Sequence, residues 1–188
     1  MNFTEVVQEV IRTTKRPDKL ADIRREVNAA VNFFSVDSEF DRDIEELLLP
    51  INSGEYSQAL SMSLLPRYRR MSYLKIGGTR HFLKELSRSE MLTECDLRNK
   101  WYIAGSSLNM NSTILGAAVD VAYYAYPPYL TDASPNFWML EGNWPAVVHR
   151  ACAAIFKDIG DIPSAQAEEG YATKDYLAFR KDQKIRST

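Results

Sequence analysis

The sequence predicts an α+β protein: a helical bundle formed by N- and C-terminal helices, with a small antiparallel β-sheet inserted between them. Three observations support this class. Apolar residues recur at helical spacing in residues 1–36 and again in residues 134–182. Between them, in residues 44–126, short turn-bounded runs alternate apolar and polar residues. Strands and helices do not alternate regularly, which argues against a parallel α/β sheet.

Residues 1–36 are predicted to form a helical hairpin. Pro17 ends the first helix, and we expect Asp18 to cap the second. The apolar stripe of the second helix runs from Leu20 to Phe34. Its other face is polar, with Arg24, Arg25, Glu26 and Asn28. Because an apolar stripe needs a cover, we expect the C-terminal helices to pack on it.

Two further helices are predicted in residues 134–182. Asn143 is a candidate N-cap, and Gly160 ends the first of the two. Asp161 or Ser164 then opens a last helix, whose apolar periodicity fades after Phe179. Small residues are frequent in both helices, namely Ala151, Ala153, Ala154, Ala165, Ala167 and Ala172. We therefore expect close packing within a four-helix core.

The middle of the chain is predicted to form short strands. These are Glu45–Ile51, Gln58–Ser63, Arg67–Ile76, Trp101–Ala104, Ser107–Asn111 and Ala117–Tyr126. Gly77 and Gly78 mark one of the turns between them. Leu108 and Met110 alternate with asparagines, so one face of that strand is expected to be buried.

Length, charge and cysteine content restrict the class of protein. The 188 residues suffice for one well-buried core, and a formal charge of −2 provides no overall basic field for nucleic acid. Cys95 and Cys152 are too few for a disulfide framework and fit a reducing cytoplasm. No apolar run approaches the ~18 residues of a membrane span. We therefore predict a soluble protein without membrane contact.

Candidate catalytic groups are sparse. His81 and His149 lie in unrelated segments, and no His or Cys pair has the spacing of a metal site. Gly77 and Gly78 are not followed by the Lys-Ser or Lys-Thr of a phosphate loop. The sequence thus predicts no enzyme activity, no cofactor and no metal. A small hydrolase would require a polar cleft that the sequence does not indicate.

Two charge clusters have alternative interpretations. The acidic run from Asp37 to Glu46 is predicted to be a solvated face or a surface for DNA or a basic neighbour. The strand Arg67–Arg70 interleaves arginines with Tyr68, as in single-strand nucleic-acid platforms. A nucleic-acid-binding module is therefore the alternative function. Edge protection or a salt-bridged subunit contact is the more common role of such a strand.

Aromatic residues cluster between Tyr123 and Trp144, together with several prolines. Rigid aromatic groups are enriched at interface hot spots. The candidate subunit-interface residues are Arg67, Arg69, Tyr123, Tyr124, Tyr126 and Trp138.

Several short motifs occur in a fixed order along nearly the whole chain. They are Asn2-Phe3-x-Glu5, Thr14-x-Arg16-Pro17-Asp18, Tyr102 with Gly105, Tyr123-Tyr124 with Pro127, Trp138, and an alanine-rich helix ending in Gly160-Asp161. This order resembles the head-to-tail adaptor proteins of tailed bacteriophages, also called connectors or gatekeepers. The segment from Asp37 to Asp96 matches least clearly.

The resemblance implies a structural virion protein at the neck, assembled in the host cytoplasm. Residues 1–188 would be a single adaptor domain, with the helical hairpin in residues 1–36, the β region in 44–126 and the C-terminal helices in 134–182. The family forms a ring, commonly of twelve copies, that docks on the portal protein. It meets tail, nozzle or tail-fibre proteins and helps retain packaged DNA. Double-stranded DNA would pass through the ring without sequence-specific binding.

The resemblance also implies that an extended C-terminus holds the portal. From residue 174 onward the sequence contains five cationic residues and two aspartates, which gives a net charge of +3. The candidate portal-docking residues are Lys174, Phe179, Arg180, Lys181, Lys184 and Arg186.

Overall fold

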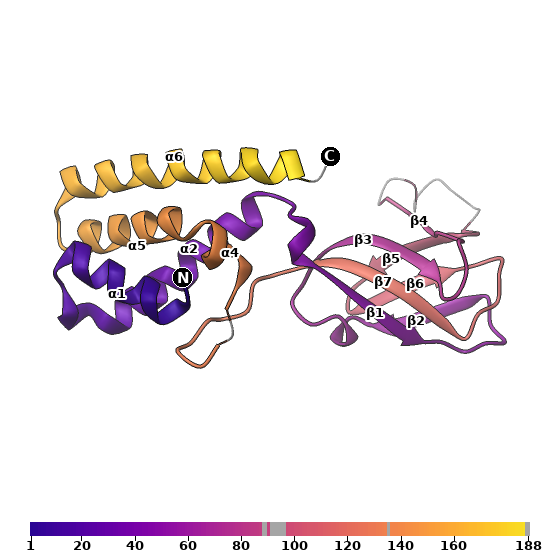
Figure 1. The fold of residues 1–188 in the computed structure, drawn as a ribbon. Coiled ribbons are helices and arrows are strands. Elements are labelled where there is room, and N and C mark those ends of the chain that lie inside the picture. The colour runs from indigo at the N-terminus through magenta and orange to yellow at the C-terminus, as the bar shows by residue number, and fades with distance from the viewer. Residues whose placement is uncertain (88–89, 91–96, 135, 187–188) are drawn as a thin grey trace. The chain divides into compact units, whose positions relative to one another are not determined.

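The protein is described by a computed structural model that covers residues 1–87, 90, 97–134 and 136–186. The chain divides into two compact units (Figure 1). The helical unit comprises Met1–Arg42 and Pro127–Thr188, and the β unit comprises Asp43–Tyr126. The β unit is thus one continuous stretch inserted into a helical unit built from both ends of the sequence.

The helical unit contains α1 (Phe3–Thr14), α2 (Leu20–Asp37), the short α4 (Trp138–Gly142), α5 (Trp144–Asp158) and α6 (Ile162–Arg186). Helix α5 packs against α1, α2 and α6. In Figure 1 it lies between α6 and the α1–α2 hairpin. The core of the unit therefore forms around α5.

Capping differs in part from the expectation. Asn2 and Glu5 form a capping box at α1, each side chain accepting from the other's backbone N–H at 2.9 Å. Asp18 does not cap α2, because it lies in a 3-10 turn and pairs with Arg16 at 2.6 Å. Asp161 does open α6, since its Oδ1 accepts from Ser164 N at 3.2 Å.

The last helix is longer than its apolar pattern suggests. The C-terminal helices were expected to end at residue 182, with apolar periodicity fading after Phe179, but α6 continues to Arg186. Phe179 packs against the helical core, and Arg180 reaches Asp37 of α2 at 3.6 Å. These contacts hold the turn from which the helix continues.

The predicted stripe of α2 is buried, apart from Leu20 at its start. Asn28, expected on the polar face, is buried as well. Its Nδ2 donates to the carbonyl of Leu130 at 3.0 Å, and its Oδ1 accepts from Leu130 N at 2.7 Å. A polar side chain therefore fixes the loop before α4 to α2.

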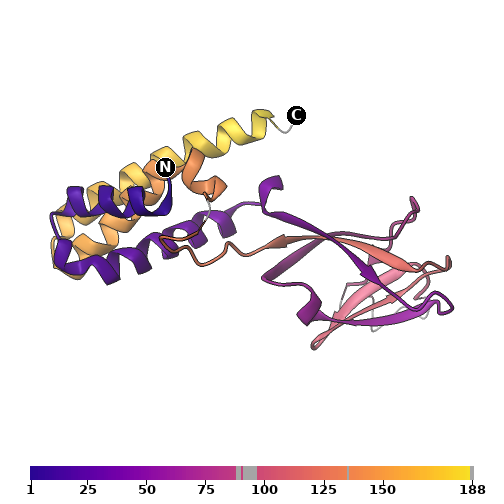
Figure 2. The ribbon, with the colours of Figure 1, turned by 60° about the horizontal axis from the view of Figure 1, so that its bottom comes forward.

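The β unit contains two sheets (Figure 2). In the first, β7 (Ala118–Ala125) lies between β1 (Ile44–Pro50) and β3 (Tyr68–Ile76), and all pairs are antiparallel. The second has the order β2 (Ser57–Ser61), β6 (Ser107–Asn111), β5 (Lys100–Ala104) and β4 (Lys84–Glu85), with β4 parallel to β5.

The expected helical bundle with one small inserted sheet is wrong, although the α+β class fits. The described residues hold sheets of three and four strands together with five α-helices. Alternation showed which strand faces are buried, but it did not show which strands pair. The two-residue β4 is also too short to produce a periodic signal.

The segment from His81 to Leu86 joins the two sheets. Leu83 N donates to the carbonyl of Leu74 in β3 at 2.8 Å, and Leu86 N donates to that of Trp101 in β5 at 2.8 Å. A single apolar core lies between the sheets. It includes Leu49, Met71, Leu74, Ile76, Trp101, Leu108, Met110, Val119, Val121 and Tyr123.

Candidate interaction surfaces

Tyr123 is placed in the core of the β unit and not on its surface. Its side chain is fully buried, and its hydroxyl donates to Glu45 Oε2 at 2.8 Å and lies 3.1 Å from the carbonyl of Pro66. Burial raises the pKa of the Tyr123 hydroxyl. The assignment of Tyr123 to an exposed subunit contact is therefore wrong for the chain as folded.

The other candidates in the β unit lie near its surface. Arg67 pairs with Glu45 and donates to the carbonyl of Tyr126 at 3.0 Å. The Arg69 guanidinium lies 5.5 Å from the centroid of the Tyr124 ring, and Tyr126 is exposed. Their role in a subunit contact stays a prediction.

Ion pairs on the three-stranded sheet do not favour the nucleic-acid alternative. Arg67 is engaged by Glu45, and Lys75 pairs with Asp120 at 3.1 Å. Tyr73 donates to Glu46 at 3.1 Å. Acidic groups thus accompany these cations, whereas a groove that tracks a phosphate backbone is positively charged.

Trp138 and Phe179 belong to the helical core. Trp138 is buried, with its ring stacked on Phe179 at 6.1 Å and against Phe40 at 5.1 Å. A Cβ added at Gly142 would lie 2.8 Å from the Phe179 ring, so this contact is tight. Neither aromatic ring offers a broad exposed surface to a neighbour or a portal.

The remaining portal-docking candidates lie along α6. Lys174 and Lys181 are exposed, whereas Arg180 is half-buried beside Asp37. Lys184 and Arg186 lie in the last turn of α6, and their side chains are outside the described part of the structure. Exposed cations are therefore present on α6 before its end.

Both histidines make structural contacts. His149 of α5 lies 2.5 Å from Glu168 and 3.7 Å from Asp175, both on α6. His81 lies 2.8 Å from Asn99 Oδ1. Cys152 is buried, and burial raises the pKa of its thiol to about 12, while Cys95 lies outside the described residues.

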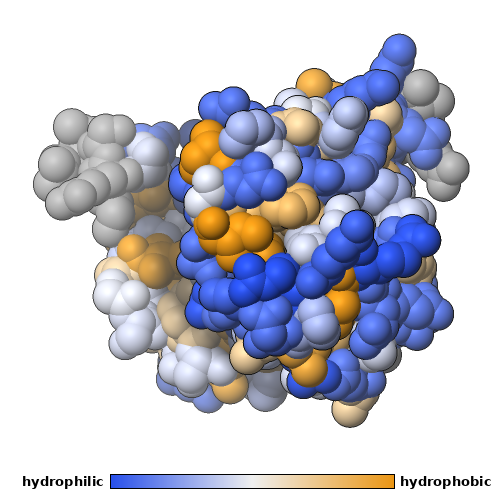
Figure 3. Space-filling model, turned by 90° about the vertical axis from the view of Figure 1, so that its left-hand side faces the viewer, coloured by the Kyte–Doolittle hydropathy of each residue, from blue (hydrophilic) through white to orange (hydrophobic). Residues whose placement is uncertain are grey.

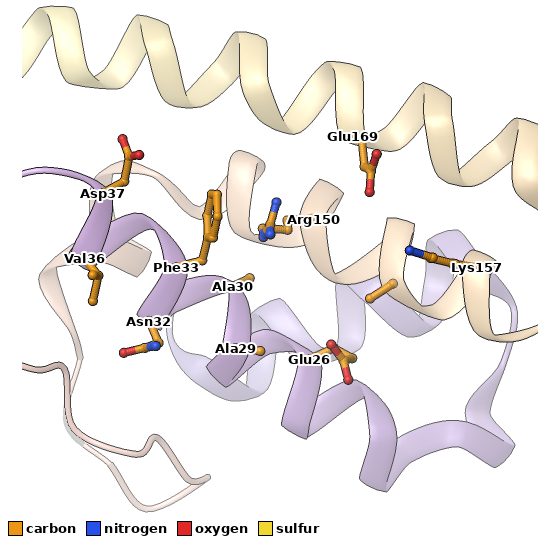
Figure 4. Close-up of a pocket in the computed structure, with 11 residues that line it drawn as sticks. Glu26, Ala29, Ala30, Asn32, Phe33, Val36, Asp37, Arg150, Lys157 and Glu169 are labelled. Atoms are coloured by element: carbon orange, nitrogen blue, oxygen red, sulfur yellow. The ribbon is translucent and has the colours of Figure 1, made fainter.

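A groove that the sequence did not predict lies in the helical unit (Figure 4). We call it the α2–α6 groove; its volume is about 650 Å³. Its lining residues are Glu26, Ala29, Ala30, Asn32, Phe33, Val36, Asp37, Arg150, Ala154, Lys157 and Glu169. The available signal was the position of Phe33 and Val36, which lie outside the buried stripe of α2 and are exposed.

The groove has walls from two helices and a floor from a third. Figure 4 shows α2 on one side, α6 on the other and α5 between them, with Glu169 pointing from α6 into the space. The guanidinium of Arg150 lies 3.5 Å from the centroid of the Phe33 ring. This cation–π contact holds the apolar side chain at the rim of the groove.

The end of the helical unit that carries the α1–α2 and α5–α6 turns has a different surface. Figure 3 shows it as largely hydrophilic, with separate small apolar spots. Within the described residues, no helix is long and apolar enough to span a bilayer. In the same part of the chain, no group of three acidic, histidine or cysteine side chains is placed to bind a metal.

These features define an α+β protein of two units, one helical and one made of two β-sheets. The sequence model of the family described as "SU10 adaptor protein" matches residues 1–186. The chain therefore belongs to the SU10 adaptor protein family, a family of phage head-to-tail adaptors. No curated protein matches the chain.

Proposed function

We propose that the protein is a structural adaptor that forms a ring beneath the phage portal and links it to tail components. The family match over residues 1–186 carries this proposal. Membership implies a component of the virion neck that interacts with portal and tail proteins. The histidines bridge structural elements, which is consistent with a role in assembly without catalysis.

In this proposal the two units act together as one adaptor domain over residues 1–188. The ring has twelve copies, as is common for such adaptors, and DNA passes through it without sequence-specific contacts. The free chain is monomeric or weakly associated and becomes a ring on the portal. Its small formal charge of −2 and the absence of a continuous apolar heptad pattern support this.

Portal attachment is assigned to the end of α6. Helix α6 has 25 residues and exposes Lys181 shortly before its last turn, which carries Lys184 and Arg186. Cations near a helix C-terminus also complement the helix dipole, which is the alternative role of these residues. Cationic side chains on a projecting helix suit acidic clefts between portal subunits.

Mass photometry of the protein with and without portal tests the ring. The expected result is small species alone and a ring on the portal. A stable monomer that is indifferent to portal but binds short DNA would contradict the proposal and favour the nucleic-acid alternative. A full ring at submicromolar concentration without portal would contradict assembly on the portal.

Removal of residues 184–188 tests the docking assignment. This truncation keeps Phe179 and Arg180, whose contacts belong to the fold. We expect unchanged folding and a sharp loss of portal attachment. A matched control, Lys15→Ala, removes a cation from the C-cap of α1 instead. A truncated protein that still assembles on portal with unchanged affinity would refute the assignment.

A further inference from the structure

We propose that the α2–α6 groove of one copy binds the exposed face of α6 from a second copy, and that this contact joins neighbours in the ring. The inference rests on the proposed ring.

The face of α6 opposite its buried stripe has a defined composition. Ala165, Ala172 and Tyr176 are buried against the rest of the unit. Gly170, Lys174 and Leu177 follow one another at spacings of four and three residues, and all are exposed. We call these three residues the outer row of α6. Leu177 is 55% exposed, a large apolar side chain that the folded chain itself leaves uncovered.

The groove offers a matching apolar contact. Phe33 is 44% and Val36 is 41% exposed at its rim. Burying Leu177 against them would remove exposed apolar area from both copies. Arg150 holds the Phe33 ring in place, so little side-chain freedom is lost there on binding.

The charges of the groove favour a lysine in the occupant. Three carboxylates line it, from Glu26, Asp37 and Glu169. Asp37 is paired with Arg180 at 3.6 Å and Glu26 with Arg25 at 3.1 Å, so Glu169 is the carboxylate that a lysine of the occupant would meet. The cation Arg150, which also lines the groove, lies over the Phe33 ring. Lys174 lies three residues before Leu177, so seating Leu177 on Phe33 places Lys174 about 4.5 Å further back along the groove, toward Glu169.

The incoming α6 of the second copy can approach the helices of the groove closely without steric clash. The floor of the groove includes Ala154, and Ala29 and Ala30 line the α2 side. Gly170 of the outer row presents no side chain, and a Cβ added there would meet nothing within 4 Å in the free chain. Small residues on both sides allow the helix backbones to approach.

The directions of the helices suit a ring. Lys19, just before α2, forms an ion pair with Asp158 at the end of α5. Asp37, the last residue of α2, pairs with Arg180 near the end of α6. Helices α2 and α6 therefore run in the same direction. Neighbours in a twelve-membered ring differ by a rotation of about 30°, so an incoming α6 would run nearly parallel to both walls. The two patches are different surfaces, and a contact of this heterologous kind closes into rings.

Mixed cysteine cross-linking of the full-length chain tests the contact. Val36→Cys and Leu177→Cys are placed in separate proteins that also carry Cys95→Ser, and Cys152 stays because its buried thiol is protected. The two proteins are mixed and oxidised gently, with and without portal. We expect a covalent dimer at least several-fold more abundant in the mixture than with either protein alone. As a matched control, Gln8→Cys on the exposed side of α1 replaces Val36→Cys and should give no dimer.

The outcomes separate this inference from the proposed function. A ring on the portal without the mixed cross-link overturns the groove contact and leaves the adaptor ring intact. Self-linking of either variant to the same extent as the mixture indicates a two-fold contact and also overturns it. Loss of both the ring and the cross-link overturns both.

A second variant tests the close approach directly. Gly170→Leu meets no neighbour in the free chain and should leave its melting temperature unchanged or slightly higher, because leucine is a better helix former than glycine. The same change should reduce ring formation on portal at least several-fold. Thr173→Leu, on the same exposed stretch of α6 but outside the outer row, is the control. Rings of Gly170→Leu that form as well as the original would contradict the contact.

Discussion

The β unit pairs charged side chains across its three-stranded sheet, whereas the helical unit holds a groove lined by charged and apolar residues. In the β unit, Lys75 pairs with Asp120 across β3 and β7, and Arg67 pairs with Glu45. In the helical unit, Phe33 and Val36 remain exposed beside the carboxylates of Glu26 and Glu169. The groove is thus a candidate contact surface that the sequence did not indicate, whereas the sequence pointed to the aromatic and arginine-rich strands.

The largest expected effect tests whether the two units are independent. Leu74 is fully buried in the core of the β unit, so Leu74→Ala should cost ~2–5 kcal/mol there. Hydrogen exchange should show lost protection in β3 and β7 and unchanged protection in α5. The control Leu48→Ala, at a site 65% exposed in β1, should change stability by no more than ~0.5 kcal/mol. Equal loss of protection in α5 would show that the units unfold together.

A smaller effect distinguishes the two sides of α5. Ala151 is buried in the helical core, so Ala151→Leu should destabilise the helical unit by ~1–3 kcal/mol through overpacking. Ala154 is half-buried and lines the groove, so Ala154→Leu should cost less. Urea titrations of the two variants measure the difference. Equal losses would indicate that the groove is closed in solution.

Alkaline pH should weaken the helical unit through Tyr176. Burial raises the pKa of its hydroxyl from about 10 in the unfolded chain to about 12, and the hydroxyl donates to Asp37 Oδ2 at 2.9 Å. Because the folded-state pKa is raised, the stabilisation is complete below pH 10 and is lost as the pH rises toward 12. Urea unfolding at pH 8, 10 and 11 measures this decline. Tyr176→Phe should decline less, and an identical decline would exclude Tyr176 as the cause.

The smallest effect concerns Cys152, whose modification should be undetectable in the folded protein. Its thiol is buried and its pKa is raised to about 12, so little thiolate exists at neutral pH. Mass spectrometry after iodoacetamide treatment of Cys95→Ser protein should show alkylation only in urea. Rapid alkylation without denaturant would indicate that α5 opens readily.

Most element positions could be predicted from local patterns, because alternation and helical spacing record which face is buried. Strands β5 and β6 and helices α2 and α5 lie close to their predicted limits. Sheet pairing could not be predicted, since β7 pairs with β1 and β3 from far along the sequence. The groove could not be predicted for a related reason. Phe33 is an apolar residue of α2 that stays exposed, and its exposure depends on how the partner helices pack.

The same limit applied to the aromatic cluster. Tyr123 and Trp138 were assigned to an interface because aromatic residues are common there, yet each fills its own unit's core. Tyr123 and Tyr124 are neighbours in β7 and point to opposite faces, but because both are aromatic, alternation could not decide which of the two is buried. Tyr123 is buried because the second sheet covers that face, and Leu108 and Met110 of this sheet lie in the same core as Tyr123.

The contiguous insertion of the β unit has a consequence for synthesis of the chain on the ribosome. All strands of the β unit have been synthesised once Tyr126 has been made, and the remaining residues of the chain carry them out of the ribosomal tunnel, so this unit can fold while translation continues. Helices α1 and α2 are made first but must wait for α5, which covers their apolar faces. Until then α1 and α2 can cover each other only in part, because the core residues Val6, Val10 and Ile23 lack their α5 partner. The first helices of the protein are thus among the last parts to reach their folded state.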